Sequence, residues 1–449
     1  MRKHFKKRFT AALLALCLVF TMASSVYAAD TAQVNIPAGT SATKTATAPD
    51  AEQVKNESQL TAQYVLNNTT FSDISDTSKF YNTSRNLILI MRSGINCDEQ
   101  VKQYMSAVKS LLNSDGTLNL KAAGYENDIW SSYSCLLITL ALAGEDASDF
   151  NGANIIKVFN DILKSQTADS FSNSKLNPYF LGIINSAVTS YSSYFNDYET
   201  ISSVIKTALI NNTVDDKGID NWGFSVDNNA LVYPHFIKMY DSDKDIKAMI
   251  DKILAYTEKT YFDTSNGTSH TVYNDWLTGA LVDEPNPDAT ALAIALYSQF
   301  GKSELAAKSY YALLDNYKSK CTPGAYTYYG SDSLFSTVDA LHGLVSYNRI
   351  LNRLANPFDV TAEAEKILDN SGSSDNQGSK DDTQENNSSD NNINENDQSA
   401  TEADNTASAA PKTGDNDNAY KYIFLIILSA SSVLLIQYLH TDRIKRESL

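Results

Sequence analysis

The sequence predicts an all-α fold in which helices of two kinds alternate. Helices of the first kind have one apolar face, formed at i, i+3, i+4 and i+7 as in Ile246, Met249, Ile250 and Ile253. Helices of the second kind, such as 289–296, are apolar or small nearly all round. A helix of that kind must be covered on every side. The alternation therefore predicts an inner ring of helices wrapped by an outer ring.

The second kind of helix recurs along the chain. When these helices are aligned on their first large apolar pair, one small polar residue recurs at spacings of 49, 45, 50, 61 and 49 residues. These residues are Thr83, Ser132, Asn177, Asp227, Asp288 and Thr337. All six belong to types that cap helix N-termini, so we expect them to be caps. The period predicts about six helical hairpins that close into an α/α toroid. Pro234 falls inside the fourth inner helix and predicts a late start or a kink there.

The chain begins like a secreted protein. Residues 1–29 carry a basic cluster, then an apolar stretch, then small residues near Ala28, which is the layout of a secretory signal peptide. Cys17 could suggest a lipoprotein signal, but Leu16 stands before it where that signal needs a small residue. We therefore expect cleavage near Ala28 and export.

The chain ends in three consecutive features. A short motif, APKTGD, occupies 410–415, a mainly apolar run occupies 420–439, and a basic tail follows. A helix of about 20 residues spans about 30 Å, the thickness of the hydrocarbon core. Basic residues favour the cytoplasmic side. The run predicts a C-terminal transmembrane helix with the rest of the chain outside.

This order of features resembles the sorting signal of Gram-positive surface proteins, an LPxTG-like motif with Ala410 in place of Leu. The resemblance implies that sortase recognises Pro411, cuts between Thr413 and Gly414, and joins Thr413 covalently to peptidoglycan. The membrane holds the C-terminal helix before cleavage. An uncleaved single-span membrane protein is the alternative. Both place the folded domain at the cell surface, and the first predicts an extracellular, cell-wall-anchored protein.

Composition divides the rest of the chain. Residues 369–410 are almost all polar or acidic and predict a disordered acidic stalk, because they cannot bury enough apolar surface to fold. Residues 30–51 are a flexible lead-in, 52–368 the toroid domain, and 411–449 the sorting signal. The formal charge of −17 argues against a nucleic-acid partner. The three cysteines after the signal leave a Cys97–Cys321 disulfide open.

Three segments support the toroid by resemblance: 287–301 (PDATALAIALYSQFG), 127–144 (NDIWSSYSCLLITLALAG) and 336–344 (STVDALHGL). They resemble repeats of the prenyltransferase, squalene-cyclase and transcobalamin group, which includes terpenoid cyclases and shares the α/α toroid. The resemblance covers roughly 54–354 and implies the architecture more than an activity.

The catalytic motifs of that group are absent from the sequence. Prenyltransferases bind zinc through Asp-x-Cys, but Ile95, Tyr133 and Ser319 precede the three cysteines at that spacing. Class II cyclases use D-x-D-D, which does not occur. The histidines of the domain show no paired metal-ligand spacing. We therefore expect no metal and no cofactor.

The loops before the inner helices carry aromatic and acidic residues, which would share one rim if the ring closes. Rings that stack on sugar faces and carboxylates that bind hydroxyls suit a glycan ligand, and two acids could hydrolyse a glycosidic bond. The candidate rim residues are Asp128, Trp130, Trp222, Asp227, Trp276, Asp288, Tyr326, Asp339 and His342. Structural roles compete: capping for Asp227 and Asp288, core packing for the tryptophans and His342, and pairing with a donor for Asp339.

With these motifs missing, whether the chain is an enzyme stays uncertain. We expect a non-enzymatic α/α toroid that binds a ligand or partner at the cell surface. The alternatives are a glycan-active hydrolase or lyase that uses rim carboxylates, and capture of a corrinoid or other small molecule by analogy to transcobalamin.

Overall fold

The computed structural model describes residues 47–221, 223–274 and 279–372. The signal segment, the stalk beyond residue 372, the predicted span 420–439, and Pro411, Thr413 and Gly414 lie outside these ranges, and what the sequence predicts for them stays a prediction. Within the described ranges, no helix is long and apolar enough to cross a membrane.

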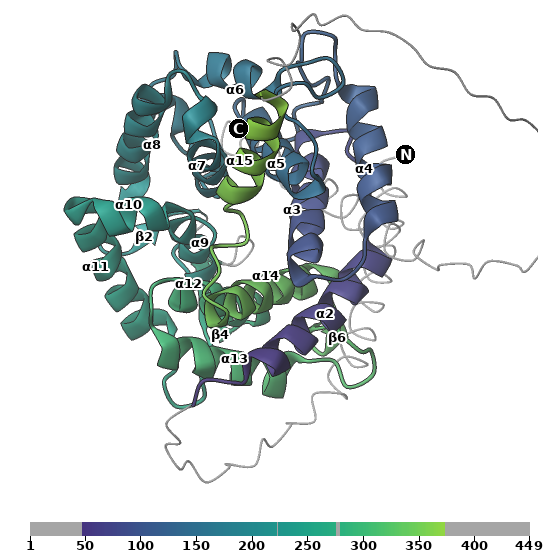
Figure 1. Ribbon diagram of the computed structural model, residues 1–449. Coiled ribbons are helices and arrows are strands. Elements are labelled where there is room, and N and C mark those ends of the chain that lie inside the picture. Colours follow the sequence, from purple (N-terminus) through teal and green to yellow (C-terminus); the bar gives the residue numbers. More distant parts are fainter. Residues whose placement is uncertain (1–46, 222, 275–278, 373–449) are drawn as a thin grey trace, which may run out of the picture. The chain divides into compact units, whose positions relative to one another are not determined.

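The described helices form two concentric rings, an α/α toroid as predicted (Figure 1). The inner helices are buried along most of their length. They are α3 (Thr77–Ser93), α5 (Ile129–Ala143), α7 (Phe180–Ser190), α12 (Pro287–Gln299), α14 (Leu334–Leu351) and a broken fourth member. The outer helices are α2 (Ala51–Asn68), α4 (Asp98–Leu111), α6 (Ile155–Leu163), α8 (Tyr198–Asn212), α11 (Lys244–Tyr261) and α13 (Ser303–Tyr317). Two short 3₁₀ turns, Ala168–Phe171 and Ser192–Tyr194, lie in the connections.

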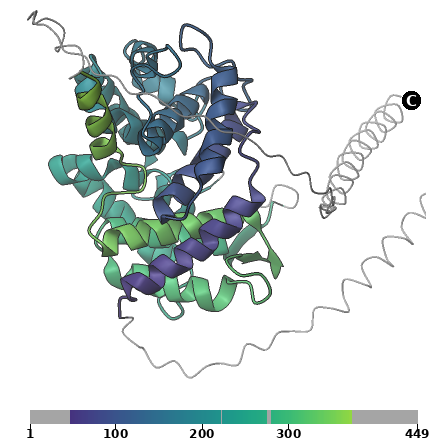
Figure 2. The same ribbon diagram turned by 45° about the vertical axis from the view of Figure 1, so that its right-hand side comes forward.

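The ring closes where its last inner helix meets its first helices. Helix α14 packs against α12 on one side and against α2 and α3 on the other, and Figure 2 shows α2 lying across α14. The contact with α12 is close because α14 has Gly343 there: a Cβ at this position would stand 2.2 Å from the carbonyl oxygen of Ala291. Glycine thus lets the two inner helices approach at backbone distance.

The fourth inner helix is broken, as Pro234 predicts. It consists of α9 (Val226–Ala230), a 3₁₀ turn η3 (Tyr233–Phe236) and α10 (Ile237–Ser242). Proline has no N–H to donate and its ring clashes with the preceding turn, so a continuous α-helix cannot pass through it. The break leaves α9 as a short helix whose first turn holds Asp227.

The expectation that the repeating polar residues are helix caps is wrong for Asp227, Asp288 and Thr337. It is confirmed for Asn177, whose Oδ1 accepts a bond from the Tyr179 backbone N–H just before α7. Helices α9, α12 and α14 are capped by Ser225, Asn286 and Ser333, whose side chains accept bonds from backbone N–H groups. Asp227 and Asp288 are each the second residue of their helix. Their carboxylates are therefore not needed to begin the helices.

The all-α prediction misses three small antiparallel hairpins before α9, α12 and α14. They are β1–β2 (Thr213–Val214 and Gly218–Ile219), β3–β4 (His270–Asn274 and Leu281–Pro285) and β5–β6 (Thr327–Tyr328 and Ser331–Asp332). The tightest turns through Tyr329 and Gly330, both with positive φ (48° and 79°), as hairpin turns require. Strands this short show no reliable alternation in sequence.

The opposite end of the ring, where the inner helices finish, is covered by the chain before and within α15 (Thr361–Gly372). Arg92 at the end of α3 donates to the carbonyls of Pro357 (2.9 Å) and Asp359 (2.6 Å) and pairs with Glu363. Phe358 packs against two inner-helix histidines. Contacts from residues 357–363 to Arg92, His235 and His342 therefore cover this end of the inner ring.

The question of a disulfide is answered for the described residues. Cys97 and Cys135 are buried, Cys321 is exposed, and all three are free.

Candidate active site

Three aspartates from three neighbouring inner helices gather near the N-terminal ends of those helices. Asp227 and Asp288 stand in the first turns of α9 and α12, and Asp339 lies about one turn deeper in α14. Helix α12 packs against both α9 and α14. Asp339 is only 3% exposed, whereas Asp227 and Asp288 keep part of their surface accessible to solvent. The acid cluster, Asp227, Asp288 and Asp339, thus extends from solvent into the interior.

Asp339 is paired with Arg85 of α3, across the closure of the ring. Arg85 Nη2 lies 2.7 Å from Asp339 Oδ1 and 3.1 Å from His342 Nδ1. Arginine can only donate, so His342 Nδ1 must accept, and the histidine is neutral with its proton on Nε2. Burial and the Arg85 charge hold the pKa of His342 well below its usual range, in agreement with that assignment.

The Arg85–Asp339 pair is under opposing influences. Burial raises the pKa of Asp339, and Arg85 opposes that rise. Burial is the largest influence and lowers the pKa of Arg85, but Asp339, Tyr81 and Cys135 together more than offset this, and the pKa of Arg85 lies above its ordinary value. We take the pair as ionised, because a guanidinium stays protonated in proteins.

Asp227 and Asp288 have no such partner. Each has one buried carboxylate oxygen, Oδ1, without a hydrogen bond, and Arg85 Nε also has none. Buried polar atoms are nearly always bonded, so an unpartnered one calls for an explanation. Three such atoms in a single neighbourhood indicate a site built to receive something else.

The environment gives Asp288 an unusual pKa of about 7. Burial is the largest cause, and the negative charges of Asp339 and Asp227 add to it, while Ser336 and Arg85 act in the opposite direction. Asp288 can therefore carry a proton near neutral pH, as a general acid must.

Asp227 is also raised in pKa by burial, but more groups stabilise its charged form. The Ser225 hydroxyl and the backbone N–H groups of Asp227 and Asn228 lower its pKa, and Asp339 raises it. The two acids thus differ in their surroundings, since Asp227 has donors for a negative charge and Asp288 has few. Two carboxyl groups whose surroundings favour different protonation states are typical of a general acid and a general base.

Two tyrosines border the cluster. Tyr81 of α3 and Tyr179, just before α7, are both partly accessible. The Tyr81 ring lies 4.5 Å from the Phe180 ring, and Tyr179 donates its hydroxyl proton to Asn228 Oδ1 at 2.6 Å. Burial raises the pKa of both tyrosines, Tyr81 to about 12, so each keeps its phenolic proton as a donor.

Three predicted rim residues have structural surroundings instead. Asp128 accepts bonds from the backbone N–H groups of Tyr125 (2.9 Å) and Asn177 (3.0 Å) and so braces two loops. Trp130 is 4% exposed with its ring 4.9 Å from that of Phe171. Tyr326 is fully buried. Trp222 and Trp276 lie outside the described residues.

Asp339 pairs with a donor, as its structural role predicts, and is also part of the acid cluster. His342 is buried as a core histidine and contacts Arg85 beside that cluster. Arg85, Tyr81 and Tyr179 were missed. Arg85 had a usable signal, since it is the one charged residue between Phe80 and Met91 in an inner helix.

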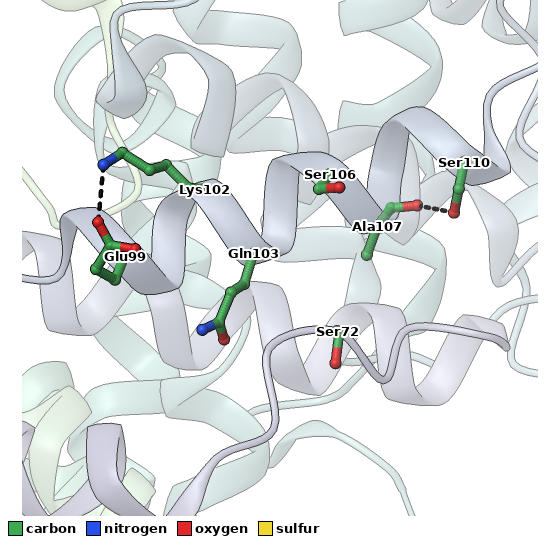
Figure 3. A pocket seen from close by; sticks show the side chains of 7 residues that line it. All are labelled: Ser72, Glu99, Lys102, Gln103, Ser106, Ala107 and Ser110. Atoms are coloured by element: carbon green, nitrogen blue, oxygen red, sulfur yellow. Dashed lines mark hydrogen bonds and ion pairs between the residues drawn. The ribbon is translucent and has the colours of Figure 1, made fainter. Parts of the chain in front are cut away.

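Other features of the described chain make weaker candidates. Its His, Cys, Asp and Glu side chains form no group of three that could hold a metal ion. A shallow hollow lies on the outer helix α4, lined by Glu99, Lys102, Gln103 and neighbouring small residues (Figure 3). Glu99 and Lys102 pair with each other at 2.8 Å, and the hollow contains no buried unpartnered side-chain atom.

Comparison with known proteins gives matches to solved structures alone: no family model and no curated protein matches the chain. It is similar to a mutant of unsaturated glucuronyl hydrolase from Streptococcus agalactiae (11% identity, 67% of this chain, 92% of that chain, TM-score 0.49). It is also similar to a glycosyl hydrolase of family 88 from Bacteroides vulgatus (14%, 68%, 99%, 0.45). A third is a glycoside hydrolase of family 105 from C. acetobutylicum (13%, 65%, 98%, 0.46).

These matches correct the functional expectation. The three structures named are glycoside hydrolases, not cyclases, prenyltransferases or binding modules. The prediction of a non-enzymatic binding module is contradicted by that finding. At such low identity the similarity concerns the fold and transfers no residue roles, so the chemistry must come from the acid cluster itself.

Proposed function

We propose that this protein is a glycoside hydrolase in which Asp288 is the general acid and Asp227 the second carboxylate. One observation carries the proposal: two carboxylates occupy the same position in neighbouring inner helices, partly open to solvent, each with a buried oxygen that no protein group satisfies. Hydrolysis of a glycosidic bond needs two carboxyl groups on either side of that bond.

The reaction assigns one proton transfer to each acid. Asp288 gives its proton to the glycosidic oxygen as the bond to the anomeric carbon breaks, and the bonding pair leaves on that oxygen. The oxygen of a water molecule bonds to the anomeric carbon, and Asp227 takes the proton that this water loses. Proton exchange with solvent then returns both carboxyl groups to their starting states.

The different surroundings of the two acids support this assignment. The pKa of Asp288 is about 7, so about half of the Asp288 carboxyl groups carry a proton at neutral pH. Asp227 has Ser225 and backbone amides that favour its negative charge. Asp339 and Arg85 act through these acids, because the Asp339 charge raises the pKa of Asp288 and the Arg85 charge lowers it. They are positioning residues.

Release of reducing ends from a panel of cell-wall and plant glycans tests the proposal. Asp288→Asn and Asp227→Asn keep the shape of each side chain but remove its proton chemistry, and each should lower kcat/KM roughly a hundredfold or more. Asp245→Asn is the matched control, since Asp245 is also the second residue of its helix but lies exposed on the outer α11. Its activity should equal that of the unchanged chain. No turnover on any glycan, or equal activity in all three variants, would contradict the proposal.

The pH dependence of kcat/KM provides a second measurement. Activity requires protonated Asp288, so it should fall about tenfold per pH unit well above 7. It requires ionised Asp227, so it should also fall at acid pH, and the profile should be bell-shaped. A rate that keeps rising from pH 7 to 9 would assign the proton donor to another group.

A further inference from the structure

Two hairpins bring aromatic and acidic residues beside Asp288. Side chains alternate between the faces of a strand. In the β3–β4 ladder, Thr271 opposes Glu284 and Tyr273 opposes Val282, so these four residues share one face. Tyr329 of the β5–β6 turn donates its hydroxyl proton to Glu284. The shared face of β3–β4 is therefore turned towards the β5–β6 hairpin.

The β5–β6 hairpin adds two rings close to the acid cluster. The Tyr328 and Tyr329 rings meet edge to face with centroids 4.4 Å apart. Burial raises the pKa of Tyr328, strand β5 contacts α14, and strand β3 contacts α9 and α12, which are the three helices of the acid cluster. Tyr329 remains 75% exposed. One ring of the pair is thus half-buried at the end of the ring that holds the acid cluster, and the other faces solvent.

Helix α14 adds a third ring. Phe335 is 70% exposed and precedes Asp339 by four residues, so both side chains lie on the same face of the helix. A phenylalanine in water forgoes the roughly 1.5–3 kcal/mol that burial would supply. Phe335 follows the β5–β6 hairpin by three residues, and groups of exposed apolar side chains mark binding surfaces. We call Tyr328, Tyr329 and Phe335 the aromatic rim.

The charge around the aromatic rim selects among sugars. Glu284 is bonded to Tyr329, and Asp332 ends the hairpin and accepts a bond from Thr322. With Asp227 and Asp288 below, the surroundings are acidic, and an anionic sugar would meet like charges at short range. An uncharged sugar instead offers C–H faces to the rings and hydroxyl donors to the carboxylates.

From this arrangement we infer that the aromatic rim is a binding subsite for an uncharged sugar residue of the glycan, with Glu284 accepting its hydroxyl protons. The inference rests on the proposed function, because it places this sugar next to the bond that Asp288 would protonate. It adds a substrate class: chains of neutral sugars are bound, and chains of uronic acids are excluded.

Binding to the full chain carrying Asp288→Asn, which holds glycans without cleaving them, tests the inference. The probes are cellohexaose and N-acetylchitohexaose, both uncharged, and hexagalacturonate, which is anionic and of equal length. Calorimetry should show binding of an uncharged hexamer and at least tenfold weaker binding of hexagalacturonate. Adding Phe335→Ala or Tyr328→Ala should weaken binding of the uncharged hexamer about tenfold, because each change removes one ring on which a sugar stacks.

The control is Leu354→Ala, because Leu354 is also exposed (50%) but follows α14 at the other end of the ring. It should leave binding and the unfolding temperature unchanged. Equal effects of Phe335→Ala and Leu354→Ala, failure of both uncharged hexamers to bind, or tighter binding of hexagalacturonate would each overturn the subsite. If the rim variants lose no binding while the unchanged chain still hydrolyses glycans, the subsite alone fails. If an uncharged hexamer binds as described but nothing is hydrolysed, the proposed reaction alone fails.

Discussion

Two buried regions of this ring contain carboxylates, and the two regions differ in how many hydrogen bonds the protein makes to them. At the ring closure, Glu57 of α2 is 7% exposed and accepts bonds from the Tyr326 hydroxyl (2.9 Å) and from Lys318 Nζ. In the acid cluster, Asp288 has an oxygen with no partner and two acidic neighbours. The protein supplies hydrogen-bond donors to both oxygens of the Glu57 carboxylate. It supplies none to Oδ1 of Asp288.

The difference separates an acid that serves the fold from an acid that serves chemistry. Taking a carboxylate out of water is costly, and bonds such as those made by Tyr326 and Lys318 offset that cost. Asp288 bears the cost without such compensation, which lowers the stability of the fold. Sites of this kind are typical of function, because natural proteins give up stability where activity needs an unsatisfied group.

The largest expected effect on stability comes from Glu57→Ala, which removes the carboxylate that Tyr326 and Lys318 contact. This change leaves the buried Tyr326 hydroxyl without its acceptor and Lys318, whose side chain is 33% exposed, without its counter-charge. The lysine can turn to water, so we expect a loss of about 2–3 kcal/mol in the free energy of unfolding, at the low end for a buried pair. Urea denaturation would measure it.

Glu57→Gln is the matched control for that change. Glutamine keeps an acceptor for Tyr326 and loses only the charge, so its cost should be clearly smaller. Kinetics on the preferred glycan should change little in either variant at a temperature where the chain is folded. An Ala variant as stable as the unchanged chain would show that the ring closure does not depend on this carboxylate.

Much of the ring could be predicted from sequence, because helix packing leaves a periodic record. The apolar face of α11 and the all-round burial of α12 follow from spacing alone. Pro234 predicted the break in the fourth inner helix through its missing N–H. The hairpins were missed because strands of two to five residues leave too short a pattern.

The acid cluster could be predicted only in part. Asp227, Asp288 and Asp339 were all singled out, but residue type does not separate a cap from a group facing the ring centre, and the caps proved to be Ser225 and Asn286. Arg85 reaches Asp339 from 254 residues away in the sequence. Such a pairing depends on how the ring closes, and nothing in local periodicity contains that information.

The smallest expected effect, and the one that sharpens the comparison most, is a gain of stability from Asp288→Asn. The pKa of Asp288 is about 7 in the fold and about 3.9 in an unfolded chain. The folded chain therefore binds more protons between these values, and its stability falls as the pH rises through that window. Asparagine cannot ionise and escapes this loss. The difference between the two pKa values corresponds to about 4 kcal/mol at full strength, and because solvent reaches part of the Asp288 side chain we expect the variant to be more stable by about 1–2 kcal/mol at pH 8 and equal to the unchanged chain near pH 4. Urea denaturation at both pH values, with the exposed Asp245→Asn as the control, measures the gain. A variant less stable than the unchanged chain at pH 8 would mean that Asp288 is satisfied in the fold as Glu57 is, and the contrast between the two regions would disappear.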